Sequence, residues 1–249
     1  MRIAMWSGPR NLSTAMMYAF AARGDCAVMD EPFYAAYLAR TGLLHPMRDA
    51  ILAAQPTDPA RVVAQLLGPV PAQKTHFYQK HMAQHMIPGI PRDWILEVTN
   101  VFLIRHPARV AASFAAKYDR PVLADIGFVQ QLDLYRYLKA EGQSPVVIES
   151  ADIRRDPAVM LQRLCAAIGL DFTPAMLSWP RGGHPQDGVW APHWYGAVHA
   201  STGFAPAEGP LPALDGWRAG LARAAMPAYE ALRAVALPLS PRDDASAPR

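Results

Sequence analysis

Four polar residues able to bind an anion stand close together near the start of the chain. They are Arg10, Asn11, Ser13 and Thr14, and they follow an apolar run at residues 3–6. The run predicts a short buried strand, residues 7–11 a turn, and the residues from Ser13 onward a helix. The backbone N–H groups of such a turn and the positive end of the helix dipole converge on an anion. The pattern therefore predicts a site for a phosphate-like group.

The composition of this turn separates it from the loop of ordinary ATPases and GTPases. Those proteins carry G-x-x-x-x-G-K followed by Ser or Thr, whereas this chain has Arg10 in the turn and Ser13 where that lysine would stand. Two alternatives stay open. Residues 27–31 read like a strand with a terminal acidic pair, which would suit a nucleotide hydrolase or kinase that uses Mg²⁺. The turn could also be a simple helix cap formed by Asn11 or Ser13.

A second strand, turn and helix follow later in the chain. Residues 101–104 are a continuous apolar run, Arg105 comes directly after them, and a helix is expected over residues 108–117. Arg105 then ends a buried strand at the carboxyl edge of a sheet, where ligands bind. If the helix begins at Pro107, Ser113 lies about 9 Å further along its axis. A phosphate that touches both Arg105 and Ser113 therefore lies alongside this helix. The alternative is an Arg105 paired with a core carboxylate and a Ser113 bonded back to its own helix.

Two neighbourhoods could supply a general base. Glu31 follows a predicted strand at residues 26–29, so its carboxylate should face the same edge as the first turn. A cap near an arginine is the other interpretation of Glu31. His81 stands next to Lys80 after a predicted strand at residues 76–79, in a stretch that can wind as a helix until Pro88. His85 would then lie one turn beyond His81, either as half of a metal pair or as a second surface histidine.

These residues need a scaffold, and strand and helix patterns alternate along the chain. A further buried strand is expected at residues 146–148, and helices at residues 61–67, 125–141, 156–168 and 217–236. The alternation predicts an α/β fold of three layers, α/β/α, with a central, mostly parallel sheet. We expect a single domain over residues 1–237 and a disordered tail over 238–249.

The segment at about residues 178–212 has little periodicity and is expected to be an irregular functional flap. Its aromatic residues could stack on a base, line an acceptor pocket or simply pack together; they are Trp179, Trp190, Trp194 and Tyr195. The acceptor pocket is expected to come from the variable segments 32–60 and 179–212.

Composition limits the classes of function. The chain has 249 residues, of which 51% are hydrophobic and 18% charged, enough for one sizeable core. A net charge of +3 suits a small anionic ligand and does not favour nucleic acid. Cys26 and Cys165 have no partners at disulfide or zinc spacing, which favours a reducing cytoplasm. No apolar run is long enough for a signal peptide or a membrane span, so no membrane partner is expected. The oligomeric state cannot be read.

Three motifs together resemble the sulfotransferases: the loop at residues 8–14, the turn at 102–107 with Ser113, and the stretch from Asp156-Pro157 to Gly169-Leu170. The resemblance covers roughly residues 1–180. It implies a P-loop NTPase-like α/β fold, 3′-phosphoadenosine 5′-phosphosulfate (PAPS) as the co-substrate, and no metal. It also implies transfer of a sulfuryl group to a hydroxyl or amine of a small-molecule acceptor, which the sequence does not identify.

The resemblance also suggests roles for individual residues. Arg105 and Ser113 would hold the 3′-phosphate, Glu31 or His81 would take the acceptor's proton, and Lys80 would steady the sulfuryl group. The 5′-phosphosulfate would lie among the residues of the first loop, with Arg10 also stabilising charge during transfer; these are Arg10, Asn11, Leu12, Ser13 and Thr14. Many family members carry glycine where this chain has Leu12. A non-catalytic nucleotide-binding module of the same fold is the remaining alternative.

Overall fold

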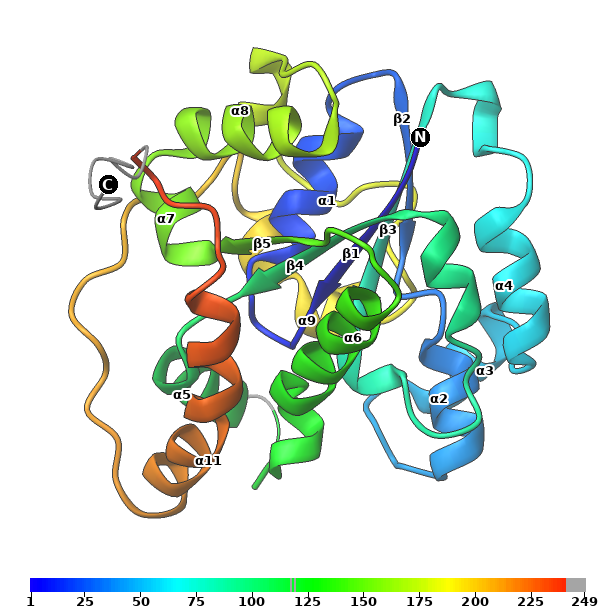
Figure 1. Ribbon diagram of the computed structural model, residues 1–249. Coiled ribbons are helices and arrows are strands. Elements are labelled where there is room, and N and C mark those ends of the chain that lie inside the picture. Colours follow the sequence, from blue (N-terminus) through cyan, green and yellow to red (C-terminus); the bar gives the residue numbers. More distant parts are fainter. Residues whose placement is uncertain (117, 119, 241–249) are drawn as a thin grey trace.

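A five-stranded parallel sheet forms the centre of the protein, as a computed structural model shows (Figure 1). The structure describes residues 1–116, 118 and 120–240; Lys117 of the expected helix and residues 241–249 of the expected tail lie outside it. The strand order is β2-β3-β1-β4-β5, and every pairing is parallel. The strands are β1 (Arg2–Ser7), β2 (Cys26–Asp30), β3 (His76–Met82), β4 (Thr99–Ile104) and β5 (Val146–Glu149). The predicted α/β class and parallel sheet are confirmed.

Helices cover both faces of the sheet and make it three-layered (Figure 1). On one face α1 (Ser13–Ala21), α7 (Ser150–Arg155) and α8 (Pro157–Ile168) pack on the sheet. On the other lie α4 (Pro59–Leu67), α5 (Pro107–Ala115), α6 (Phe128–Ala140) and α11 (Gly216–Arg233). The remaining helices are α2 (Tyr34–Thr41), α3 (Arg48–Ala54), α9 (Ala191–Trp194) and α10 (Gly196–His199). None of the helices among the described residues is long and apolar enough to cross a membrane.

Alternation along the central strand β1 divides the core between the two faces. Met5 belongs to the cluster under α1 and α8, whereas Trp6 belongs to the cluster under α5, α6 and α11. Successive strand residues point to opposite faces, and both faces are covered. This explains why the central strands read as continuous apolar runs rather than as alternating ones.

The structure corrects the expected helix at residues 80–86. Strand β3 continues to Met82, and only the single 3₁₀ turn Ala83–His85 follows it. Strand β3 is held from both sides, because Lys80 pairs with Asp30 of β2 and Met82 pairs with Ser7 of β1. The pairing with β2 up to Lys80 and with β1 up to Met82 gives this strand ladder hydrogen bonds that a helix would lose. Lys80 and His81 are therefore on opposite faces.

The other boundaries differ less from expectation. Helix α6 begins at Phe128, after a 3₁₀ turn at Leu123–Ile126, instead of at residue 125. Helix α11 ends at Arg233, before the expected residue 236. The irregular flap contains the short helices α9 and α10.

The turn after β1 packs tightly against the backbone that precedes α6. The Gly8 Cα lies 3.4 Å from where a Cβ would stand on Gly127, and a Cβ on Gly8 would overlap the carbonyl oxygen of Ile126. Only glycine fits there without moving main chain.

Gly8→Ala is expected to lower the free energy of unfolding by about 1–3 kcal/mol, because its methyl group meets backbone that cannot rotate away. Gly220→Ala in α11 is the matched control, since no atom outside its own helix lies within 4 Å of the new methyl group. That control should be neutral or stabilising by up to about 1 kcal/mol. Urea unfolding measures both. A Gly8→Ala protein as stable as Gly220→Ala would contradict the packing described here.

Candidate active site

A cavity of about 290 Å³ opens where β2, β3 and β4 end. Glu31, Lys80 and Arg105 reach it from the carboxyl ends of these three strands, and residues 9–15 of the first turn and α1 line it beside them. Carboxyl ends of parallel strands are where open α/β sheets bind ligands. The structure therefore brings the first turn and Arg105 of the second predicted phosphate motif to one cavity. Ser113 lies behind this lining and contacts Arg10.

The first turn leaves the start of α1 without a side-chain cap. Leu12 occupies the N-cap position with φ 72° and makes no capping hydrogen bond, so the Asn11 or Ser13 cap is not formed. Arg10 also has a positive φ of 64°. Left-handed residues in a turn point successive N–H groups inward. The first N–H groups of α1 are thus directed toward the cavity, where an anion would satisfy them.

The Asn11 side chain anchors this turn from below. It is fully buried, and its amide donates to the Leu103 carbonyl of β4 at 3.1 Å. The Gln131 amide of α6 donates to the carbonyls of both Trp6 and Leu103, each at 3.1 Å. Asn11 was expected to surround the ligand. Its side chain is instead used within the protein, which leaves its backbone to face the cavity.

Arg10 links the first turn to the second phosphate motif. Its Nε donates to the Ser113 hydroxyl at 2.9 Å and its Nη1 to the Trp194 carbonyl at 3.3 Å. Arg105 in turn donates to the Arg10 carbonyl at 2.7 Å. Burial lowers the pKa of Arg10, and the positive charge of Arg105 lowers it further. Two guanidinium groups held this close are suited to share an anion.

Ser113 and Arg105 differ in detail from the alternatives drawn from the sequence. Ser113 accepts a hydrogen bond from Arg10, so its hydroxyl is not confined to its own helix. Arg105 does pair with a carboxylate, that of Glu208 in the irregular segment. Sequence reasoning did not single out Glu208, because nothing in its local pattern points to a partner 103 positions away.

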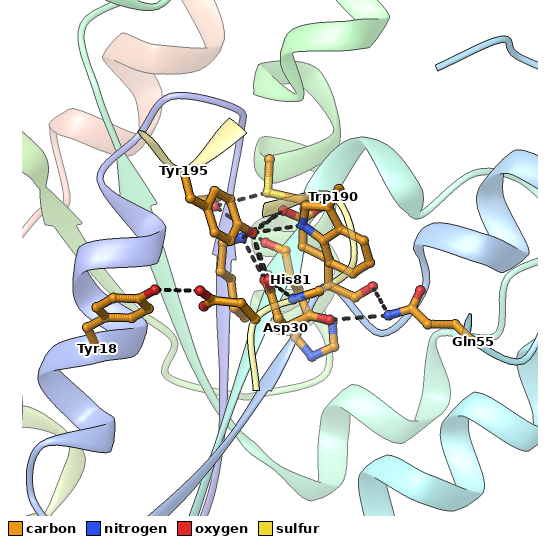
Figure 2. A network of polar contacts seen from close by, with 12 residues as sticks. Tyr18, Asp30, Gln55, His81, Trp190 and Tyr195 are labelled. Atoms are coloured by element: carbon orange, nitrogen blue, oxygen red, sulfur yellow. Dashed lines mark hydrogen bonds and ion pairs between the residues drawn. The ribbon is translucent and has the colours of Figure 1, made fainter. Parts of the chain in front are cut away.

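A buried ammonium group, that of Lys80, also lines the cavity. Lys80 Nζ donates to Asp30 Oδ1 at 2.8 Å, to Glu31 Oε1 at 2.6 Å and to the Tyr195 hydroxyl at 2.6 Å. Tyr195 in turn donates to Asp30 Oδ2 at 2.8 Å and accepts from Trp190 Nε1 at 2.8 Å. Figure 2 shows Asp30, Trp190 and Tyr195 converging in this network. The flap thereby reaches the strand ends through Tyr195. The sequence did not indicate that Tyr195 bonds to Lys80 and Asp30.

Local backbone geometry aims Glu31 at Lys80. Glu31 has a φ of 40°, unusual for a residue with a side chain. The Gln55 amide supports this conformation by donating to the carbonyls of Asp30 and Glu31, at 3.3 and 3.2 Å (Figure 2). The Glu31 N–H also donates to the Lys80 carbonyl at 2.9 Å. Strained backbone held by several bonds is common at functional sites.

The environment shifts the protonation of this cluster. Burial raises the pKa of Glu31, which the neighbouring Lys80 charge only partly opposes. Burial lowers the pKa of Lys80, but the two carboxylates outweigh burial and the net shift is upward. Lys80 therefore stays charged, and Glu31 is a stronger base than an exposed carboxylate.

His81 lies away from the cavity, and its expected place beside the site is corrected. Its ring stacks on Trp6 at 4.5 Å between centroids, and its Nε2 lies 3.4 Å from Gln79 Oε1. Burial lowers the pKa of His81 to about 3. The physical reason is the continuation of β3, which sends Lys80 to the cavity and His81 into the core.

His85, in contrast, lines the cavity and is not a surface residue. Its ring stacks between Tyr34 and Tyr37, at 4.7 and 4.8 Å between centroids. Burial keeps its pKa well below the ordinary value, so the ring is neutral. Among the described residues, no group of three or more metal-ligating side chains comes together.

Both variable segments contribute to the cavity wall. Tyr34, Tyr37 and His45 contribute from the first, and Trp194 and Tyr195 from the flap. Trp179 lies elsewhere, edge-on to Tyr18 and Phe204. Trp190 is buried and packs edge-on against Tyr34. The flap aromatics are thus divided between the cavity wall and the core behind it.

Comparisons with known proteins agree with this architecture. Residues 1–236 match the family model described as a sulfotransferase domain. The chain is 37% identical over 202 residues to branched-chain-amino-acid aminotransferase-like protein 2 of Arabidopsis thaliana, and 36% identical over 236 residues to protein 1 of that name. These alignments cover 81% and 93% of this chain but only 36% and 41% of the relatives, so the chain spans about two fifths of their length.

A solved structure shares the fold. The sulfotransferase domain of the Synechococcus PCC 7002 olefin synthase superposes with a TM-score of 0.52 at 19% identity, over 96% of each chain.

The buried His81 ring predicts loss of stability in acid. Its pKa of about 3 in the folded chain lies below the value near 6.5 of an unfolded histidine. The unfolded chain therefore binds more protons between these values, and lowering the pH through this range reduces stability by up to about 1.4 kcal/mol per pH unit. His81→Phe, which keeps the stacking on Trp6, should flatten this slope. Urea midpoints measured from pH 7 to pH 5 test it, and identical slopes in both proteins would contradict it.

Proposed function

The chain belongs to the sulfotransferase domain family, and from this premise we propose that it transfers a sulfuryl group from PAPS to a hydroxyl or amine of a small acceptor. The observation that carries the proposal is the meeting of two anion-binding motifs and a buried carboxylate–ammonium pair at one cavity. PAPS carries a phosphate on its ribose 3′ oxygen and a phosphosulfate on its 5′ oxygen, so its binding needs two such motifs. The group that is transferred needs a cation and a base beside it.

The first turn is the proposed site of the 5′-phosphosulfate. The start of α1 offers uncapped N–H groups, and Leu12, Ser13 and Thr14 line the cavity there. Arg10 adds a guanidinium group from the same turn. Leu12 already holds the left-handed conformation that glycine adopts easily. The side chain at this position therefore does not prevent the turn geometry.

In the proposed reaction, transfer occurs in line. The acceptor oxygen or nitrogen attacks sulfur while the Glu31 carboxylate takes its proton. The bond between sulfur and the bridging phosphate oxygen breaks, and 3′-phosphoadenosine 5′-phosphate leaves. Arg10 and the α1 N–H groups stabilise the negative charge that develops on the leaving phosphate. Lys80, charged and 2.6 Å from Glu31 Oε1, stabilises charge on the sulfuryl oxygens.

The acid pair does not favour the alternative of a Mg²⁺-dependent hydrolase or kinase. Asp30 and Glu31, which would hold the ion, both accept hydrogen bonds from the Lys80 ammonium group. Their charge is therefore already partly compensated by a side chain. The first turn, with Ser13 in place of the lysine of those enzymes, supports the same choice.

The cavity wall suggests what kind of acceptor enters. Tyr34, Tyr37, Phe114 and Tyr118 present aromatic surface, and His85 is neutral. We place the acceptor against this wall as a small molecule without strong charge.

Cys26 and Cys165 are both free and buried, which supports a cytoplasmic location.

Glu31→Gln tests the proposed base. Turnover of labelled PAPS should fall by about 10²–10⁴-fold, because the amide cannot accept the acceptor's proton. Binding of 3′-phosphoadenosine 5′-phosphate should stay unchanged. In the wild type, activity should rise with pH through a pKa of Glu31 that lies above the ordinary carboxyl range. This acid limb should disappear in the variant.

Glu141→Gln, at the exposed end of α6, is the matched control and should keep full turnover. Full turnover in Glu31→Gln as well would refute the assignment of the base. A wild type that binds the nucleotide but never sulfates an acceptor in a broad metabolite screen would favour the non-catalytic module.

Calorimetry tests the donor itself. The protein should bind 3′-phosphoadenosine 5′-phosphate more tightly than ATP, and equally well in EDTA, because guanidinium and backbone groups rather than a metal bind the phosphates. Tighter binding of ATP, or binding that needs Mg²⁺, would favour the hydrolase or kinase instead.

A further inference from the structure

A carboxylate lies buried among three arginines, one of which, Arg105, lines the cavity. Glu208, whose side chain is only 3% exposed, pairs with Arg105 of the β4 end, with Arg109 of α5 and with Arg154 of α7. Its Oε1 accepts from Arg105 Nε at 3.1 Å and from Arg154 Nη1 at 2.7 Å, and its Oε2 lies 2.9 Å from Arg109 Nε. Guanidinium groups from three separate elements therefore converge on a single acid.

The same arginines also bind the backbone around Glu208. Arg154 Nε donates to the Pro206 carbonyl at 2.8 Å, and Arg109 donates to the Gly209 carbonyl. Residues 206–209 are thus held across the arginine cluster. Just before them, Gly203 and Ala205 line the cavity itself.

The charges of this cluster are unequal. Its ion pairs set three guanidinium groups against one carboxylate. Like charges brought this close are costly unless enough negative charge lies among them. A phosphate monoester carries nearly two negative charges and three acceptor oxygens. It therefore fits three planar, two-pronged donors better than a carboxylate does.

We propose that Arg105, Arg109 and Arg154 together form the site for the donor's 3′-phosphate, and that Glu208 occupies it until the phosphate displaces it. The inference rests on the proposed PAPS dependence and goes beyond it in two ways. Arg109 and Arg154 join Arg105 as specificity determinants. Glu208 is a built-in competitor, and its displacement frees residues 206–209 when the donor binds.

Removal of the competing charge should strengthen donor binding. Glu208→Gln should bind 3′-phosphoadenosine 5′-phosphate about tenfold more tightly than the wild type does, since close charge pairs of this kind are strongly coupled. The affinity for adenosine 5′-phosphosulfate, which lacks the 3′-phosphate, should change by less than about twofold. Glu230→Gln, at an exposed position of α11, removes the same charge and should change neither affinity.

A second variant guards against a folding defect in the first. Arg154 does not line the cavity, so Arg154→Gln leaves the lining intact. This variant should bind 3′-phosphoadenosine 5′-phosphate about tenfold more weakly, with nearly unchanged affinity for adenosine 5′-phosphosulfate. Hydrogen exchange gives an independent readout. Exchange over residues 203–210 should rise when 3′-phosphoadenosine 5′-phosphate binds the wild type, and should already be high in Glu208→Gln without nucleotide.

The outcomes separate this inference from the proposed function. If the wild type binds 3′-phosphoadenosine 5′-phosphate and Glu208→Gln binds it no more tightly, Glu208 serves only to stabilise the fold. In that case the inference fails and the proposed function stands. Equal losses for both nucleotides in Arg154→Gln would also refute it. If neither the wild type nor Glu208→Gln binds 3′-phosphoadenosine 5′-phosphate, the proposed donor is wrong and the inference fails with it.

Discussion

The buried Lys80 ammonium group is the constraint on which the site depends. A charge in the interior is costly unless opposite charge and hydrogen-bond acceptors surround it. Asp30, Glu31 and Tyr195 supply both, from the adjacent strand end and from the flap. To meet this demand, Asp30 at the end of β2 must pair with Lys80 of β3, Glu31 must take up its positive φ, and Tyr195 of the flap must reach the strand ends. One charge thereby joins three segments far apart in the sequence.

The opposite side of the cavity is organised by an excess of positive charge. Arg10, Arg105, Arg109 and Arg154 all lie near the start of α5 or the first turn, and internal acceptors take up only part of their hydrogen-bonding capacity. The protein thus has a cationic cluster beside open N–H groups and, lining the same cavity, a Glu31 carboxyl whose pKa burial raises. Such a division suits the proposed transfer between an anionic donor and a neutral acceptor, because positive charge and a carboxylate line one cavity.

Much of the architecture could be predicted because its signals are local. Apolar runs at residues 3–6 and 101–104, each followed by a polar turn and a helical pattern, indicated both strand–turn–helix units and the parallel sheet. The run at residues 101–104 placed Arg105 at a strand end, and the predicted strand at residues 26–29 did the same for Glu31. The ends of strands that depend on neighbouring strands could not be predicted from the sequence. Whether residues 80–82 form strand or helix was decided by β1 and β2 on either side of β3, so His81 entered the core instead of the cavity.

The sequence alone therefore determined the α/β class, the polar turn between the first strand and helix, and the acidic strand end, since each follows from neighbouring residues within a few positions. That no side chain caps α1 was decided by the structure. The tertiary structure decided the partners. Tyr195 contacts Asp30 across 165 positions, and Glu208 reaches Arg105 across 103. Both come from a segment without periodicity, whose path is determined by the charges it must neutralise. Long-range pairing of this kind leaves no local pattern, because it depends on where the whole sheet places those charges in space.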